Sequence, residues 1–267
     1  MKNLILTLTL LVSFVSFGQT STEYFNRGYD KAEAKDYNGA ISDYTKAIEL
    51  DPNEAVAYLN RGVSKNELKD YNGAISDFTK AIELDPNDAN VYLGIGNSIN
   101  ELGDYNVAIR YYNIAIELDP NYADAYISKG NSKNLLGDHP GAIRDYNKAI
   151  GIDPNKKEAY YGRAWSKDDL KDFNGAISDY NKAIELDPNY TDAYFKIGTL
   201  KNNLELYAGA ISDFTKAIEI DPSGGEPYYN RGISKYYTND LNGACEDAKK
   251  SASLGIDASK LIELACN

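Results

Sequence analysis

A 34-residue period is the feature that most constrains how this chain can fold. The stretch 36–53, DYNGAISDYTKAIELDPN, returns with small changes almost to the end of the chain. Prolines mark the step, and they stand at Pro52, Pro86, Pro120, Pro154, Pro188 and Pro222. A fixed period of this size is typical of a solenoid of stacked units, so we expect an array instead of a single compact core.

Several other columns align when each proline is set at position 32 of its unit. The units cover residues 21–54, 55–88, 89–122, 123–156, 157–190, 191–224 and a degenerate 225–256. Position 4 is tyrosine and position 20 is alanine in all seven units. Position 8 is glycine in every unit except the fifth, which has Ala164. Small residues at these intervals let two helices approach closely.

This pattern resembles the tetratricopeptide repeat, a helical hairpin with aromatics at positions 4 and 24, Gly at 8, Ala at 20 and 27, and Pro at 32. The resemblance covers roughly nine tenths of the chain. It implies an all-α fold, a right-handed α-solenoid of helix-turn-helix hairpins. We expect helix A at positions 1 to 14 and helix B at positions 17 to 31. Unit seven departs from the pattern, with Ala248 at position 24 and Ile256 at position 32.

The first 18 residues, MKNLILTLTLLVSFVSFG, predict a secretory signal peptide. Lys2 precedes an apolar run, and small residues at Ser16 and Gly18 suit a cleavage site. An amino-terminal membrane anchor is the alternative, although the run is shorter than the ~20 residues that a span requires. Cleavage leaves the array at 19–256, and we expect an exported protein, periplasmic or secreted.

Charge and residue content argue against several classes of function. A net charge of −12 repels a phosphate backbone or an anionic membrane surface, so we expect neither partner. The one histidine, His139, stands at position 17, where the other units carry mostly aromatic residues, and no Cys/His group has zinc-ligand spacing. We therefore expect no enzyme, no cofactor and no metal. A carboxylate pair around Asp168 and Asp169 is the remaining candidate for catalysis.

Acidic and amide residues stand where helices begin and end. We expect the aspartates before helix B to act as N-caps. They are Asp36, Asp70, Asp104, Asp138, Asp172 and Asp240. Asparagines before the next helix A are expected to cap it in the same way, namely Asn53, Asn87, Asn121, Asn155 and Asn189. The Asp-Pro pairs end helix B, because a residue before proline avoids helical backbone angles.

One pair of columns predicts ion pairs within the units. Position 11 is lysine and position 23 is aspartate in every unit but the third, which has Ile99 and Tyr111 instead. Losing both charges together is expected if the two side chains face each other across the hairpin. The alternative is that both are solvated. The predicted pairs are Lys31 with Asp43, Lys65 with Asp77, Lys133 with Asp145, Lys167 with Asp179, Lys201 with Asp213, and Lys235 with Asp247.

The last residues predict a terminal cap. Gly255 can end one helix and Asp257 can cap another, so we expect a capping helix within 257–267 that covers the last apolar face. Cys245 and Cys266 stand ten and eleven residues to either side of Gly255. In an oxidising compartment this spacing favours a disulfide, and two buried free thiols are the alternative.

The resemblance implies that helix A positions 2, 5, 9, 12 and 13 line a concave groove that holds partner segments. In this chain these positions carry no lysine or arginine and nine carboxylates, so we expect a neutral or basic protein segment. Asparagines there suit an extended backbone, and Trp165 is a natural hot spot. Position 5 can instead serve packing, and the asparagines can simply be solvated. The candidate groove residues are Phe25, Tyr29, Asn66, Asn97, Asn100, Asn131, Asn134, Tyr161, Trp165, Asp168, Asp169, Phe195, Asn202 and Tyr229.

The sequence thus predicts a non-enzymatic scaffold for protein–protein interaction. Some relatives hold acidic carboxyl-terminal tails through a lysine at position 5, but no unit here has one, so we do not expect that mode of binding. The alternative is a structural or self-assembling spacer protein of the cell envelope.

Overall fold

A computed structural model describes residues 19–266, so the predicted signal peptide lies outside the described residues. This part of the chain forms fifteen α-helices and no strand. It divides into two compact bodies, one ending at Pro86 and the other beginning at Asn87. The two bodies are described separately.

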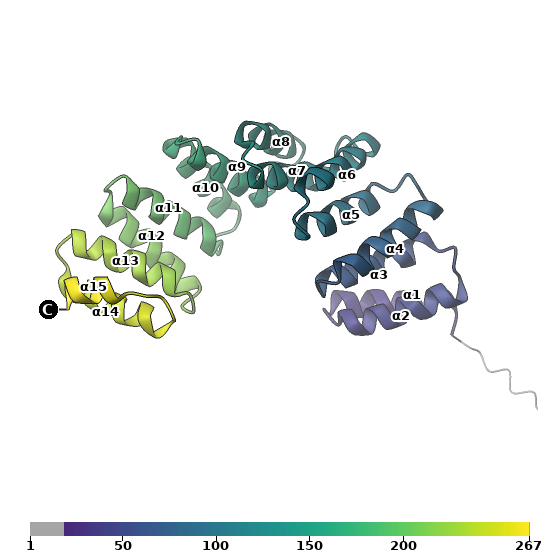
Figure 1. Cartoon of the computed structure of the whole chain (residues 1–267), viewed down its shortest axis with the longest axis horizontal. Coiled ribbons are helices and arrows are strands. Elements are labelled where there is room, and N and C mark those ends of the chain that lie inside the picture. Colours follow the sequence, from purple (N-terminus) through teal and green to yellow (C-terminus); the bar gives the residue numbers. More distant parts are fainter. Residues whose placement is uncertain (1–18, 267) are drawn as a thin grey trace, which may run out of the picture. The chain divides into compact units, whose positions relative to one another are not determined.

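The first body contains units one and two. Its helices are α1 (Ser21–Glu33), α2 (Tyr37–Leu50), α3 (Ala55–Glu67) and α4 (Tyr71–Leu84). Within each unit the two helices form an antiparallel hairpin, and α2 packs on α3 to join the two hairpins (Figure 1).

The second body contains units three to seven and the terminal cap. Each pair of successive helices is in contact, as in the first body. The helices are α5 (Ala89–Glu101), α6 (Tyr105–Leu118), α7 (Ala123–Leu135), α8 (His139–Ile152), α9 (Lys157–Asp169), α10 (Phe173–Leu186), α11 (Thr191–Asn203), α12 (Tyr207–Ile220), α13 (Gly225–Tyr237), α14 (Leu241–Ser253) and α15 (Ser259–Ala265). The predicted all-α solenoid of hairpins is confirmed, and its helix ends lie within one residue of the prediction in the six full units.

A buried ring on helix B lies against the glycine of helix A. A Cβ atom built on Gly28 would come within 2.9 Å of the Tyr44 ring, and one on Gly96 within 2.4 Å of the Tyr112 ring. Both rings are almost completely buried. In these units position 8 is glycine because the ring at position 24 occupies the space that a side chain would need. Unit five is the exception, with Ala164 and Tyr180 in one buried cluster.

Helix α15 fills the space that the missing ring leaves in unit seven. Ala248 leaves the space over Gly232 open, and Leu261 of α15 fills it, 3.0 Å from the place of a Gly232 Cβ. Leu261 forms a small core with Ala244 and Ala248. Cys245 and Cys266 are joined in a disulfide with their Cα atoms 5.0 Å apart, and this bridge ties α15 to α14.

The aspartates before helix B cap it, but the asparagines before helix A do not. All six aspartates accept a hydrogen bond from the backbone N–H three residues on, as Asp36 does from Gly39. The prediction for the asparagines is wrong, because the N-cap residue of each following helix A is the next residue along. Asn53, Asn121 and Asn155 instead donate their own backbone N–H to the aspartate before the proline, which closes the loop.

The turn between helices A and B has a left-handed residue at position 15 in all seven units. Gly103 and Gly137 occupy it in units three and four, with φ of 88° and 80°. The other five units place a residue with a side chain there, such as Lys69 at φ 62°. Residues with a Cβ atom are disfavoured in this region by roughly 1–2 kcal/mol.

We therefore expect the same Gly→Ala change to act in opposite directions at two sites of unit four. Gly137→Ala should lower the melting temperature, because the left-handed turn penalises a Cβ atom. Gly151→Ala, inside α8 with no neighbour within 4 Å, should raise it, because alanine favours a helix over glycine by up to ~1 kcal/mol. Circular dichroism melting checks both, and a lower melting temperature for Gly151→Ala would contradict the account.

Candidate functional site

The structure places all six predicted lysine and aspartate pairs in contact. The Nζ to Oδ distances lie between 2.6 and 2.8 Å. The aspartates are buried, as for Asp77 at 4% exposed, except Asp213, which is half-buried. These side chains hold helix A to helix B.

Sequence reasoning missed a second cation on most of these aspartates. Position 7 supplies it, and Arg61 and Arg163 each place a guanidinium nitrogen 2.6 Å from the aspartate of the same unit. The same arginines lie over the tyrosine at position 4, with Arg61 5.5 Å from the Tyr58 ring centre. The sequence of unit three could have revealed this second cation. It has Ile95 at position 7, and it also lacks the lysine and the aspartate.

The asparagines at position 12 join adjacent units instead of offering their amides to a ligand. Asn100 Oδ1 accepts from Ser132 Oγ at 2.6 Å, and Asn202 Oδ1 accepts from Ser234 Oγ at 2.6 Å. The interpretation of Asn134 as a groove contact is wrong, because the residue is 4% exposed and its amide is fully engaged. Its Oδ1 accepts from Ser166 Oγ, and its Nδ2 donates to the Tyr146 hydroxyl and to the Gly162 carbonyl. Asn66 is half-buried.

The asparagines at position 9 are exposed, and each accepts a hydrogen bond from the buried tyrosine hydroxyl of its own unit. Tyr112 donates to Asn97 Oδ1 at 3.0 Å, and Tyr146 donates to Asn131 Oδ1 at 2.7 Å. The amide nitrogens of Asn97 and Asn131 remain at the surface as potential donors to a ligand.

The aromatic residues at position 5 pack against the position 24 rings of their own units. Ring centroids lie 5.6 Å apart for Phe25 and Tyr44, 5.3 Å for Tyr161 and Tyr180, and 5.8 Å for Phe195 and Phe214. Each of Phe25, Tyr161 and Phe195 is half-buried, so it serves packing and keeps part of its ring at the surface. Tyr29, at position 9, is exposed.

Unit five brings Trp165, Asp168 and Asp169 to one side of α9. Trp165 and Asp168 stand one helical turn apart and are both half-buried, while Asp169 is exposed. Burial raises the pKa of the Asp168 carboxyl above its usual value, and the charge of Asp169 adds to this effect. Asp169 Oδ2 lies 3.7 Å from Nδ1 of His139, and the same nitrogen lies 3.3 Å from Asn134 Oδ1.

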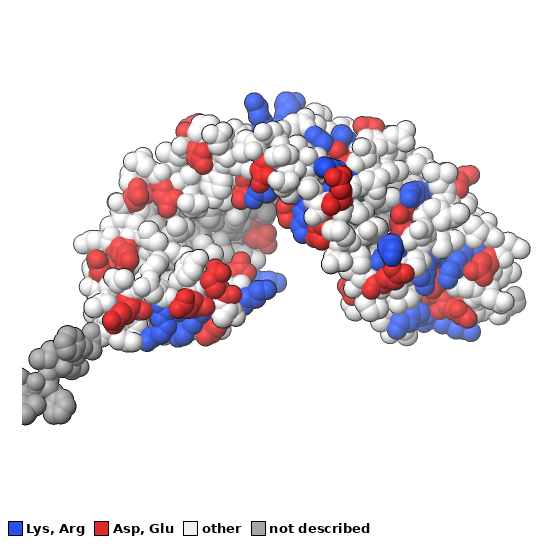
Figure 2. All heavy atoms as spheres, turned by 180° about the vertical axis from the view of Figure 1, so that it is seen from behind, with Lys and Arg blue, Asp and Glu red and all other residues white. Residues whose placement is uncertain are grey.

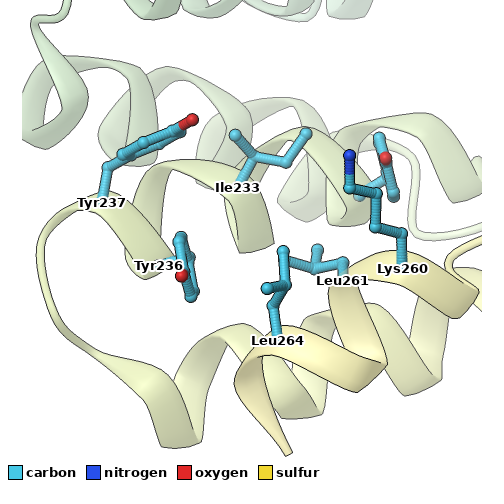
Figure 3. A pocket seen from close by; sticks show the side chains of 7 residues that line it. Ile233, Tyr236, Tyr237, Lys260, Leu261 and Leu264 are labelled. Carbon is cyan, nitrogen blue, oxygen red and sulfur yellow. The ribbon is translucent and has the colours of Figure 1, made fainter.

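A pocket of about 190 Å³ lies between α13 and α15, and the sequence predicted only one of its residues, Tyr229. Leu261 and Leu264 of α15 point toward Ile233 of α13 (Figure 3). Tyr236 and Tyr237 stand at one end of the pocket and Lys260 at the other. The signal was present in unit seven, whose groove positions 5, 9, 12 and 13 are all tyrosine or isoleucine.

Charges of both signs lie beside one another on the face of the two bodies that Figure 2 shows. Within residues 19–266 no group of three or more His, Cys, Asp or Glu side chains could hold a metal ion. In the same residues no helix combines the length and hydropathy of a membrane span.

Family models for this repeat match several segments of the chain. The models described as tetratricopeptide repeat match residues 55–88, 95–157 and 191–223, and the one described as TPR repeat matches 28–68 and 169–203. The chain belongs to the tetratricopeptide repeat (TPR) family. No curated protein sequence matches it.

Solved TPR structures are similar to this chain over most of its length. A tetratricopeptide repeat protein from Parabacteroides merdae has a TM-score of 0.67 and 20% identity over 94% of this chain and 100% of its own, which shows the fold alone. YrrB, a TPR protein with an unusual peptide-binding site, has a TM-score of 0.57 and 27% identity over 70% of this chain and 96% of its own. MamA has a TM-score of 0.54 and 30% identity over 63% of this chain and 92% of its own.

The ion pairs predict opposite pH dependences for two aspartates. The Arg27 guanidinium, with Lys31, lowers the pKa of Asp43 to about 2 against the effect of burial, so its stabilising effect is complete above about pH 4 and is lost between about pH 4 and 2. Burial raises the pKa of Asp213, which has Lys201 but no arginine, so its ionised form costs stability as the pH rises.

Melting curves from pH 2 to 7 for the wild type, Asp43→Asn and Asp213→Asn check this contrast. The difference between the wild type and Asp43→Asn should shrink as the pH falls below about 4. The melting temperature of the wild type should fall relative to that of Asp213→Asn as the pH rises. Parallel curves for the two variants would contradict the assignment.

Proposed function

We propose that this TPR protein is a non-enzymatic scaffold that binds a neutral or basic protein segment along the helix A face of its units. The observation that carries the proposal is the sorting of charge on that face. Positions 2, 5, 9, 12 and 13 hold no lysine or arginine, although the chain has 28 basic residues. The acidic residues at these positions are Glu33, Glu67, Glu101, Asp124, Glu158, Asp168, Asp169, Asp192 and Glu226.

Two kinds of surface group suit a peptide ligand. The amides of Asn97 and Asn131 can donate to an extended backbone. Trp165 is half-buried and belongs to the residue type most enriched in binding hot spots. Similarity to YrrB, whose structure is described as having a peptide-binding site, supports a peptide ligand. The basic residues at positions 7 and 11 of helix A are used within the units, where they pair with the aspartates at position 23.

We also propose that the protein is exported. The composition of residues 1–18 supports export, and a disulfide between Cys245 and Cys266 suits an oxidising compartment.

Selection of peptides from a random phage-displayed library against the mature chain tests the proposal. We expect selected peptides to be neutral or basic, because the acidic helix A face repels carboxylates. They should bind Trp165→Ala at least about tenfold more weakly, a loss of ~1.4 kcal/mol. The matched control is Leu50→Ala, since Leu50 is 55% exposed at the end of α2, a helix B, and lies outside the helix A positions.

Melting curves establish that both variants fold. Acidic selected peptides, or peptides that bind the wild type and Trp165→Ala equally, would contradict binding in the helix A face. A failure to select any peptide would also count against it.

A further inference from the structure

Unit five departs from the repeat at the positions that elsewhere form polar contacts. Position 9 is Trp165, where units three and four have asparagine, and position 12 is Asp168, where units two, three, four and six have asparagine. The next unit has Leu200 at position 10, where the serines stand that bond those asparagines. Leu200 is 1% exposed and has no hydroxyl to donate, so Asp168 lacks the partner that its counterparts have.

The Tyr180 hydroxyl is left without a hydrogen bond by the same changes. Tyr180 is fully buried, and its hydroxyl bonds no residue of the described part of the chain. In unit four the equivalent Tyr146 hydroxyl donates to Asn131 at position 9 and accepts from Asn134 at position 12. By this equivalence we expect the Tyr180 hydroxyl to lie on the side of Trp165 and Asp168.

Two of the buried tyrosine hydroxyls at position 24 lack a hydrogen bond within the described part of the chain. Tyr44 of unit one is the one other tyrosine at position 24 whose hydroxyl has no hydrogen bond among residues 19–266, and Ala32 stands at position 12 of that unit. Units two and six avoid the problem because Phe78 and Phe214 have no hydroxyl. Unit five alone combines an unbonded buried hydroxyl with a carboxylate at position 12.

The carboxylate of Asp168 is held without a close cation. None of the ion pairs within residues 19–266 includes Asp168, although Lys171 and Lys196 act on its charge from further away. Asp169 adds a second negative charge and has His139 at 3.7 Å. A half-buried carboxylate costs stability unless a positive group neutralises it.

From these features we propose that Asp168, Asp169, Trp165 and the Tyr180 hydroxyl form a receptor for an arginine side chain of the bound segment. The proposal rests on the proposed binding of a neutral or basic segment to the helix A face. The guanidinium donates to the Asp168 and Asp169 carboxylates and to the Tyr180 oxygen, and its flat face lies on the Trp165 ring.

Arginine fits this set better than lysine. A guanidinium carries five donors in a fixed plane and can serve two carboxylates and a phenol oxygen at once, while an ammonium is a compact point charge. The planar group also stacks on an indole ring. Binding would neutralise Asp168 and satisfy the Tyr180 hydroxyl together.

The test uses the mature protein and the blocked peptide acetyl-Gly-Gly-Arg-Gly-Gly-amide, with citrulline and lysine versions as comparisons. Citrulline keeps the shape of arginine and lacks its charge. Trp165 is the only tryptophan in the chain, so its fluorescence reports on this site directly. We expect saturable change with the arginine peptide and at least about tenfold weaker binding of the other two.

Asp168→Asn is the test variant, and Glu246→Gln, which removes one exposed carboxylate from α14, is the matched control. Asp168→Asn should weaken binding of the arginine peptide at least about tenfold, and Glu246→Gln less than about twofold. Equal binding of arginine and citrulline, tight binding of lysine, no saturable change, or an unaffected Asp168→Asn variant would each overturn the receptor.

The peptides selected from the phage library separate this inference from the proposed function. If they lose binding to Trp165→Ala but bind Asp168→Asn as they bind the wild type, the arginine receptor fails and the scaffold proposal stands. If they bind Trp165→Ala normally, the scaffold proposal fails, and the arginine peptide still reports on the receptor by itself.

Discussion

The packing of a helix B ring against a helix A glycine is the interaction on which the rest of the structure depends. It sets the separation of the two helices in the hairpin, and in unit three it leaves no room for a side chain at position 8, because a Cβ at Gly96 would lie 2.4 Å from Tyr112. Unit five instead packs Ala164 and Tyr180 in one buried cluster. The same interaction explains the end of the chain. Unit seven has Ala248 in place of the ring, and Leu261 of α15 fills that space, so the cap is part of the packing scheme.

Much of this could be predicted from the sequence because the repeat allows units to be compared with one another. The hairpins follow from the tyrosine, glycine, alanine and proline columns, and the lysine and aspartate contacts follow from their joint loss in unit three. The arginines at position 7 were missed because unit six keeps Asp213 at position 23 although Ile197 at position 7 has no charge. Positions 7 and 23 therefore do not lose their charges together in every unit. The role of Asn134 was missed because its serine partner is 32 residues away in the next hairpin.

The contacts that recur from unit to unit also explain why we propose a ligand site in unit five. The repeated charges and amides of this TPR protein hold the framework together: arginine and lysine neutralise the buried aspartates within units, and asparagine at position 12 bonds serine of the next hairpin. Ile197 in unit six and Ala32 in unit one also depart from these columns, but neither places an extra charge on helix A. Unit five departs at Trp165 and Asp168, and the Tyr180 hydroxyl loses its hydrogen bonds, a cost expected at a site adapted to a ligand instead of to folding.

The melting temperatures of Asp168→Asn and Asp179→Asn at neutral pH test this claim most directly, since both changes remove one carboxylate from unit five. Asp179 is 5% exposed and pairs with Arg163 and Lys167, so its loss should destabilise the protein by ~3 kcal/mol. Asp168→Asn should raise the melting temperature, because it removes a carboxylate whose pKa is raised by burial and gives the Tyr180 hydroxyl an amide donor. A lower melting temperature for Asp168→Asn, comparable to that of Asp179→Asn, would show that Asp168 belongs to the structural framework and would contradict the account.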